Sequence, residues 1–207
     1  MVAIAKGQEQ KVKTKLTYEE FLEISPKDGK YELIDGELVA VANTRQHENI
    51  VAFIYKKFDR EIDHLSLDLV VRQNVSIKTN KIHGLSQGRV PDISIIDRDT
   101  WYSNPSDYSS LIEPIQLAIE VVSTNWTDDY VDKFDEYQRL GIPEYWIVDY
   151  MAITSREFLG NPKVPTVFVN LLDENGKYQT TKFTGDDKIN SRTFSELDLT
   201  VAQILNI

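Results

Sequence analysis

Three carboxylates stand among apolar residues, where an ionised side chain is costly. Asp92 begins the apolar run DISII, Glu120 is flanked by apolar residues in AIEVV, and Glu32 lies in the alternating segment YELIDGELVAV. Burying an ionised carboxylate costs several kcal/mol unless a cation or hydrogen bonds compensate it. The sequence therefore favours a functional cluster of acids, and the alternative is that each acid is satisfied by a buried arginine or by backbone donors.

The positions of Asp92 and Glu120 suit a site for a divalent metal ion. Each lies in a segment expected to be a strand, and a long connection separates the two segments. If the strands pair, both carboxylates can bind one hard cation such as Mg²⁺ or Mn²⁺. Mg²⁺ takes oxygen ligands and keeps several waters. Such an ion can orient a water molecule and neutralise charge on a phosphodiester.

The elements expected around these acids mix helices and strands. Asp35-Gly36 between two alternating runs predicts a hairpin. A strand, a helix and a strand over 115–149 have the length of a βαβ crossover, so part of the sheet should be parallel. We expect an α/β fold in which helices flank a central mixed sheet with additional β-hairpins. The expected elements are the hairpin 31–41, the helix 47–62, strands at 67–77, 90–96 and 115–123, the helix 128–140, the strand 145–149, the hairpin 167–183 and the helix 201–206.

Composition limits the class of protein. The chain has 207 residues, of which 41% are hydrophobic, so we expect an N-terminal tail over 1–16 and a single domain over 17–207. No apolar run reaches the roughly 18 residues of a membrane span, and the lack of cysteine excludes disulfides and a thiol nucleophile. We expect a cytoplasmic protein.

The net charge of −10 argues against a general nucleic-acid coat, because phosphate binding needs clustered lysine and arginine. One acid-free basic stretch runs from Lys78 to Arg89 just before Asp92. It is expected to be a loop that borders the acids and contacts phosphate, with Lys81 as its third basic residue. The alternative is an ordinary solvated loop.

Four motifs in order resemble the Uma-type restriction endonuclease family, which is part of the PD-(D/E)XK nuclease superfamily. The resemblance covers roughly residues 17–200. The motifs are YELIDG at 31–36, VPDI at 90–93, EVVS at 120–123 followed by a helix with Lys133 and Tyr137, and GIPEYWIVD at 141–149.

This resemblance implies a restriction-endonuclease-like fold, a Mg²⁺ or Mn²⁺ cofactor and DNA as the substrate. It implies that Asp92 and Glu120 are metal ligands. The peptide carbonyl of Val121 would be a third ligand, and Glu32 an accessory acid near the metal.

The lysine of the superfamily motif should stand at position 122, where this chain has Val122. In the resembling family the lysine comes from the following helix, which here means Lys133 as the catalytic lysine. The alternative is a surface lysine whose stem covers the apolar face of the helix. His47, at the start of an expected helix, is a candidate phosphate contact or base, and its alternative is a structural role.

Three readings of the function remain open. The first is a metal-dependent endonuclease that cleaves DNA. The second is a non-catalytic binding or regulatory module with the same fold, which Val122 and the acidic segment 123–132 favour. The third is a structural acidic protein whose buried carboxylates pair with Arg72 or Arg89. The sequence leaves the oligomeric state open, with a homodimer as one arrangement.

Overall fold

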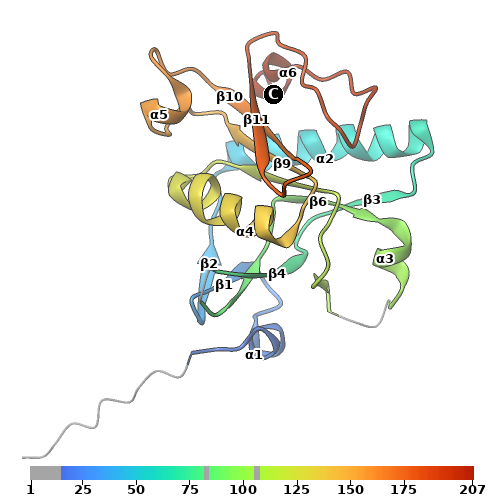
Figure 1. The fold of residues 1–207 in the computed structure, drawn as a ribbon, viewed down its shortest axis with the longest axis vertical. Coiled ribbons are helices and arrows are strands. Elements are labelled where there is room, and N and C mark those ends of the chain that lie inside the picture. Colours follow the sequence, from blue (N-terminus) through green and yellow to red (C-terminus); the bar gives the residue numbers. More distant parts are fainter. Residues whose placement is uncertain (1–14, 82–83, 105–107) are drawn as a thin grey trace, which may run out of the picture.

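The computed structural model describes residues 15–81, 84–104 and 108–207, whose strands form two sheets of five and six strands (Figure 1). Most of the expected N-terminal tail, residues 1–14, lies outside the described residues. Within the described ranges, no helix is long and apolar enough to cross a membrane. The expectation of one domain over 17–207 stays a prediction.

The larger sheet is mixed, as the sequence predicts. Its order is β11-β10-β9-β8-β6-β3, in which β8 and β9 run parallel and the other neighbours run antiparallel. The parallel pair confirms the crossover predicted over 115–149. Its strands are β3 (Leu69–Arg72), β6 (Ile93–Asp97), β8 (Leu117–Val121), β9 (Glu144–Asp149), β10 (Thr166–Leu172) and β11 (Tyr178–Thr184).

The smaller sheet contains the first hairpin. Its order is β2-β1-β5-β4-β7. Asp35 and Gly36, with φ of 51° and 79°, form the turn between β1 and β2, so the predicted hairpin is confirmed. The strands are β1 (Lys30–Ile34), β2 (Glu37–Val41), β4 (Ser76–Asn80), β5 (Ser86–Arg89) and β7 (Ser110–Leu111).

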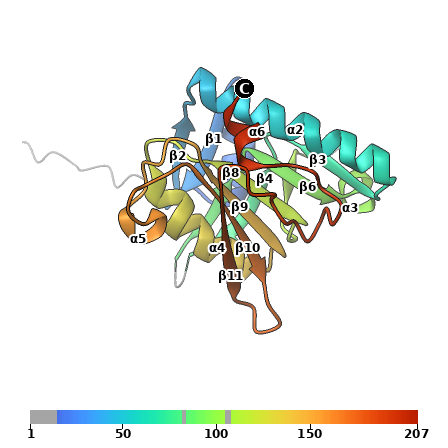
Figure 2. The same ribbon diagram turned by 90° about the horizontal axis from the view of Figure 1, so that it is seen from above.

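Helices cover both faces of the larger sheet (Figure 2). One face packs against α2 and α6, and the other packs against α4, while α1 lies on the smaller sheet. The predicted helix 47–62 is confirmed, since its apolar residues spaced by four are all buried. The helices are α1 (Tyr18–Ile24), α2 (Arg45–Leu65), α3 (Arg98–Tyr102), the π-helical turn η1 (Asp128–Asp132), α4 (Lys133–Leu140), α5 (Arg156–Leu159) and α6 (Val201–Leu205).

The alternation of side chains along β8 decides which face carries Glu120. Ile119 and Val121 join the core beneath α2, whereas Ala118 and Val122 join the core beneath α4. Because successive side chains of a strand point to opposite faces, Glu120 points toward α4. This buried acid therefore faces the helix that follows it in the chain.

Two expectations about strands and loops are wrong. The predicted strand 67–77 is two strands in different sheets, because Asn74 has a left-handed backbone (φ 57°) that interrupts the run between β3 and β4. The expected loop from Lys78 to Arg89 is mostly the antiparallel pair β4–β5, with residues 82–83, including His83, outside the described part. Alternating hydrophobicity is weak in these short polar strands, so the pattern did not reveal them.

Candidate active site

Asp92 and Glu120 come together because their strands pair. The antiparallel register of β6 and β8 matches Ile93 with Ile119, which sets Asp92 across from Glu120. Asp92 Oδ2 accepts a hydrogen bond from the N–H of Val121 at 2.8 Å. Both acids are buried, with 7% and 2% of their surface exposed. The structure thus brings together the three residues expected to hold a metal ion.

The helix after β8 supplies a buried ammonium to this pair. Lys133, at the start of α4, lies with its Nζ 3.1 Å from Glu120 Oε1 and 3.4 Å from Glu32 Oε1. It also lies 3.3 Å from Asp129 Oδ1, one turn earlier. One turn later, the hydroxyl of Tyr137 donates to Glu120 Oε1 at 2.9 Å. Lys133 is 6% exposed, so its alternative as a surface lysine is wrong.

Val122 occupies the position of the superfamily lysine and is fully buried in the core beneath α4. Two residues after Glu120 on the same strand, its side chain belongs to the same face of the sheet. That position is used for packing, and the ammonium reaches Glu120 from the helix above it.

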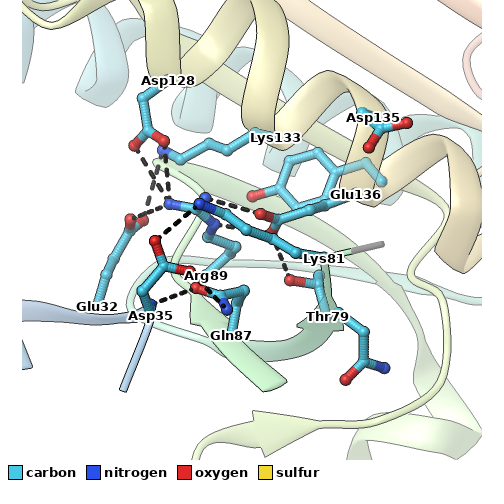
Figure 3. Close-up of polar contacts among 12 residues, drawn as sticks. Glu32, Asp35, Thr79, Lys81, Gln87, Arg89, Asp128, Lys133, Asp135 and Glu136 are labelled. Atoms are coloured by element: carbon cyan, nitrogen blue, oxygen red, sulfur yellow. Dashed lines mark hydrogen bonds and ion pairs between the residues drawn. The ribbon is translucent and has the colours of Figure 1, made fainter. Parts of the chain in front are cut away.

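Glu32 is held by a second buried cation (Figure 3). Arg89 is completely buried, and its Nη1 lies 3.3 Å from Glu32 Oε2 and 3.1 Å from Asp128 Oδ1. Its other nitrogens donate to both oxygens of Glu136 at 2.8 Å. Thr79 donates to the same Glu136. Arg89 therefore joins the hairpin acid to the helix that carries Lys133.

The expected phosphate-contacting stretch is not a free basic surface. Lys78 pairs with Glu19 at 2.7 Å and Lys81 pairs with Asp35 at 3.1 Å, while Arg89 is buried. The third reading named Arg89 as a partner for a buried acid, and the geometry agrees.

The other arginine of that reading lies elsewhere. Arg72 donates to the hydroxyl of Tyr102 and stacks over Trp101. Its guanidinium therefore belongs to the region of α3 and is no counter-ion for the acids.

Asp92 has two cationic neighbours of its own. Lys30 Nζ donates to Asp92 Oδ1 at 2.7 Å, and His47 Nε2 lies 3.0 Å from Asp92 Oδ2. His47 sits in the first turn of α2, which the side chain of Thr44 caps. Sequence reasoning missed Lys30. The alternation of side chains along a strand could have indicated it, because Lys30 and Glu32 are two residues apart on β1 and share a face.

Burial and neighbouring charges together raise the pKa of some of these acids and lower that of another. Burial raises the pKa of Glu120 to about 8, and nearby Lys133 only partly offsets this. Burial likewise raises the pKa of Asp129 to about 6. For Asp92, the charge of Lys30 and the hydrogen bond with His47 outweigh burial and hold the pKa well below its usual range. The two acids therefore differ in the metal-free site: the pKa of Asp92 is held low, whereas that of Glu120 is raised.

The site can be divided by the cations around which its acids lie. The inner half comprises Glu32, Glu120, Asp129, Lys133 and Arg89, which are all buried. The outer half comprises Asp92, Lys30 and His47.

Solvent reaches the site at the outer half. Lys30 retains 13% side-chain exposure. A cavity of about 120 Å³ lies here, lined among others by Lys30, Asn43, Asn74 and Asp92. A small ligand would therefore enter past Lys30.

The donor set fits a hard divalent cation. Carboxylate and carbonyl oxygens are the ligands that Mg²⁺ takes. Six carboxylates of the described part form ion pairs with three lysine or arginine side chains of this cluster. These residues are Glu32, Asp92, Glu120, Asp128, Asp129 and Glu136, with Lys30, Arg89 and Lys133.

The protein would supply only a few of the ligands of such an ion. In the described part of the chain, no three acidic or histidine side chains are grouped to hold a metal ion. Asp92, Glu120 and the Val121 carbonyl would offer two side chains and one backbone oxygen. Mg²⁺ commonly binds through one or two carboxylates and keeps several waters, so this set is compatible with it.

Comparisons with known proteins agree with this architecture. A crystal structure of a putative nuclease belonging to DUF820 from Anabaena variabilis ATCC 29413 superimposes with a TM-score of 0.70 at 17% identity, over 92% of this chain and 98% of that one. This likeness shows the restriction-endonuclease-like fold. A comparison with curated proteins gave no match. The family model Uma2, described as "Putative restriction endonuclease", matches residues 18–202. The chain therefore belongs to the Uma2 family.

Proposed function

We propose that the protein is a metal-dependent endonuclease that hydrolyses phosphodiester bonds of DNA. The observation that carries the proposal is the contact of a buried lysine, Lys133, with Glu120, whose strand pairs with that of Asp92. A cation beside paired acids is the arrangement expected where negative charge builds on a phosphate. Membership of the Uma2 family supports a nuclease-like function.

In this proposal, Asp92, Glu120 and the carbonyl of Val121 hold Mg²⁺ or Mn²⁺. When bound, the ion would stabilise charge on the phosphate and make a coordinated water more acidic. Its positive charge would also favour the deprotonated form of Glu120, whose pKa is raised in the metal-free site. Residues of the chain supply the remaining functions.

Lys133 is proposed to stabilise negative charge and to orient the attacking water, since its ammonium lies between Glu120 and Glu32. Glu32 then acts as the accessory acid that holds this ammonium in position. Lys30 is proposed to contact the phosphate, because it lies at the exposed edge of the site. His47 orients Asp92 through its hydrogen bond.

A second candidate is the non-catalytic binding module. The observation that favours it is that protein groups already compensate the acids: Lys30, His47 and the Val121 N–H contact Asp92, while Lys133 and Tyr137 contact Glu120. Such a cluster can be a structural feature of a fold that has lost its chemistry. A cytoplasmic location stays a prediction under either candidate.

Plasmid nicking with Mg²⁺ or Mn²⁺, together with calorimetric titration of the metal, tests the proposal. We expect the wild type to nick supercoiled DNA and Glu120→Gln to lose both metal binding and nicking. Glu174→Gln, at an exposed position in the turn between β10 and β11, is the matched control and should behave as wild type. Metal binding without nicking, across several DNA substrates, would favour the non-catalytic module. Absence of metal binding would contradict both the cofactor and the reaction.

A further inference from the structure

A second and larger cavity adjoins the outer half of the site. It has a volume of about 470 Å³ and lies between α1, the start of β1 and the residues near Ser76 and Tyr108. Lys30 and Asn74 line both this cavity and the smaller one at Asp92. Its volume falls in the range of about 300–1,000 Å³ that is usual for small-molecule sites. A group bound here would therefore be a direct neighbour of a group bound at Asp92.

Aromatic rings line this larger cavity. Phe21 is buried, Tyr31 is half-buried and Tyr108 is 59% exposed. Gly29, with φ of +100°, passes close to the ring of Tyr31, and a Cβ at this glycine would lie 3.2 Å from that ring. A residue with a side chain at position 29 would therefore push the ring of Tyr31 out of its place along the cavity. Flat aromatic walls favour a flat apolar ligand.

Two lysines, Lys27 and Lys30, and one acid, Glu23, are among the residues that line the cavity. Lys30 also lines the smaller cavity, and its ammonium donates to Asp92. The aromatic cavity thus lies next to Lys30, and Lys30 borders the proposed phosphate site. A nucleotide has the same order of groups, since one sugar joins its flat base to its phosphate.

We propose that this cavity receives one unstacked base of the DNA substrate, next to the phosphate at Asp92. The inference rests on the proposed function and names the form of its substrate. Stacking on aromatic side chains is tolerant of sequence, since every base has a π-face. A base in a duplex must first be unstacked at a cost of a few kcal/mol, which is least for mismatched or single-stranded DNA. The protein therefore prefers single-stranded, mismatched or frayed DNA to intact duplex.

Fluorescence anisotropy with a labelled single-stranded oligonucleotide tests this inference. Ca²⁺ replaces Mg²⁺, because it takes the same oxygen ligands, and the titration is repeated with EDTA. We expect tighter binding of the single strand than of its duplex. Placing one abasic nucleotide at each position in turn should weaken binding at least about fivefold at one position, the lower end for loss of a stacked base.

Variants assign that effect to the cavity. Tyr108→Ala should remove the penalty of the abasic nucleotide, and Tyr108→Phe should keep it because the ring remains. Tyr102→Ala is the matched control, since Tyr102 is similarly exposed at 53% and does not line this cavity. Because Tyr108 is exposed, we expect its variants to fold. The thermal unfolding of each variant checks that they do.

Three results overturn the inference, and they are distinguishable from one another. Salt-dependent DNA binding with no abasic penalty at any position, or a penalty that survives in Tyr108→Ala, contradicts the base-binding cavity and leaves the nuclease proposal intact. No binding of single-stranded or duplex DNA at low salt contradicts the proposed function as well.

Discussion

The inner and outer halves of the site both compensate buried carboxylates, but with different cations. In the inner half, Lys133 and Arg89 compensate acids that are all buried. In the outer half, Lys30 and His47 compensate Asp92 beside a cavity. A charge pair buried on all sides is costly to break, because removing one partner leaves the other uncompensated. We therefore expect substitutions of the inner cations to cost more stability than substitutions in the outer half.

The largest effect is expected at Glu120, the inner-half residue that the pairing of β6 and β8 sets across from Asp92. Glu120→Gln keeps the shape of the side chain but removes its charge, so cleavage should fall below detection and Mg²⁺ binding should be lost. Calorimetry and plasmid nicking measure the two effects. If Glu120→Gln binds Mg²⁺ as the wild type does, Glu120 is no ligand and the inner half is purely structural.

Lys133→Met tests the inner half itself. We expect cleavage to fall by about 10²-fold or more, the scale for the loss of one preorganised electrostatic group. Because Lys133 contacts three carboxylates, the metal-free variant should also lose about 3–5 kcal/mol of unfolding free energy. Mg²⁺ should restore part of that stability, since the ion would compensate Glu120, one of these three acids. Urea unfolding with and without Mg²⁺ measures this, and an unchanged cleavage rate would exclude a catalytic lysine at this position.

Arg89→Met removes the other inner cation without touching Glu120. We expect a loss of about 3 kcal/mol in unfolding free energy, since Glu32 and Glu136 lose their shared partner. Cleavage should fall by about 10-fold, a smaller loss than for Lys133→Met, because Arg89 acts by positioning Glu32 and α4. Arg192→Met is the exposed control. Equal cleavage losses for the two inner variants would show that Arg89 does more than position its neighbours.

Lys30→Ala probes the outer half and should be milder. Asp92 keeps its contacts with His47 and the Val121 N–H, and solvent can enter the cavity, so we expect a stability loss of about 1 kcal/mol. DNA affinity should drop and its salt dependence should flatten, as one fewer counter-ion is released. Anisotropy at several salt concentrations measures this. A stability loss as large as that of Lys133→Met would remove the distinction between the halves.

A last test is the pH dependence of stability. The pKa of Glu120 is raised to about 8 and that of Asp129 to about 6, both above their values in an unfolded chain. A group of this kind stabilises the fold at low pH, and the contribution disappears as pH rises through the folded pKa. With EDTA present, unfolding free energy should therefore decline between about pH 5 and pH 8. Glu120→Gln should flatten this decline, and Mg²⁺ should stabilise the wild type more at pH 8 than at pH 5.

The sequence revealed the acids of the site more readily than their partners. Asp92 and Glu120 could be found because a carboxylate within an apolar run is conspicuous. Lys30 is harder to find: the strand period places it on the same face as Glu32, but a lysine at the start of a hairpin strand is ordinary and its partner lies 62 positions along the chain. Arg89 was assigned to a basic loop because local charge indicates exposure, whereas the pairing of β4 with β5 buries it. Long-range pairing decides such cases, and a single sequence does not display it.

The π-helical turn before α4 has a consequence for insertions and deletions. The N–H of Lys133 bonds to the carbonyl of Asp128, five residues earlier, so this turn contains one residue more than an α-helical turn would. Deleting one residue within 128–132 would convert it to regular helix and rotate everything before it relative to α4 by about 100°. Asp128 and Asp129 would then leave Arg89 and Lys133. A single extra residue thus sets the helical phase that brings Asp128 to Arg89 and Asp129 to Lys133.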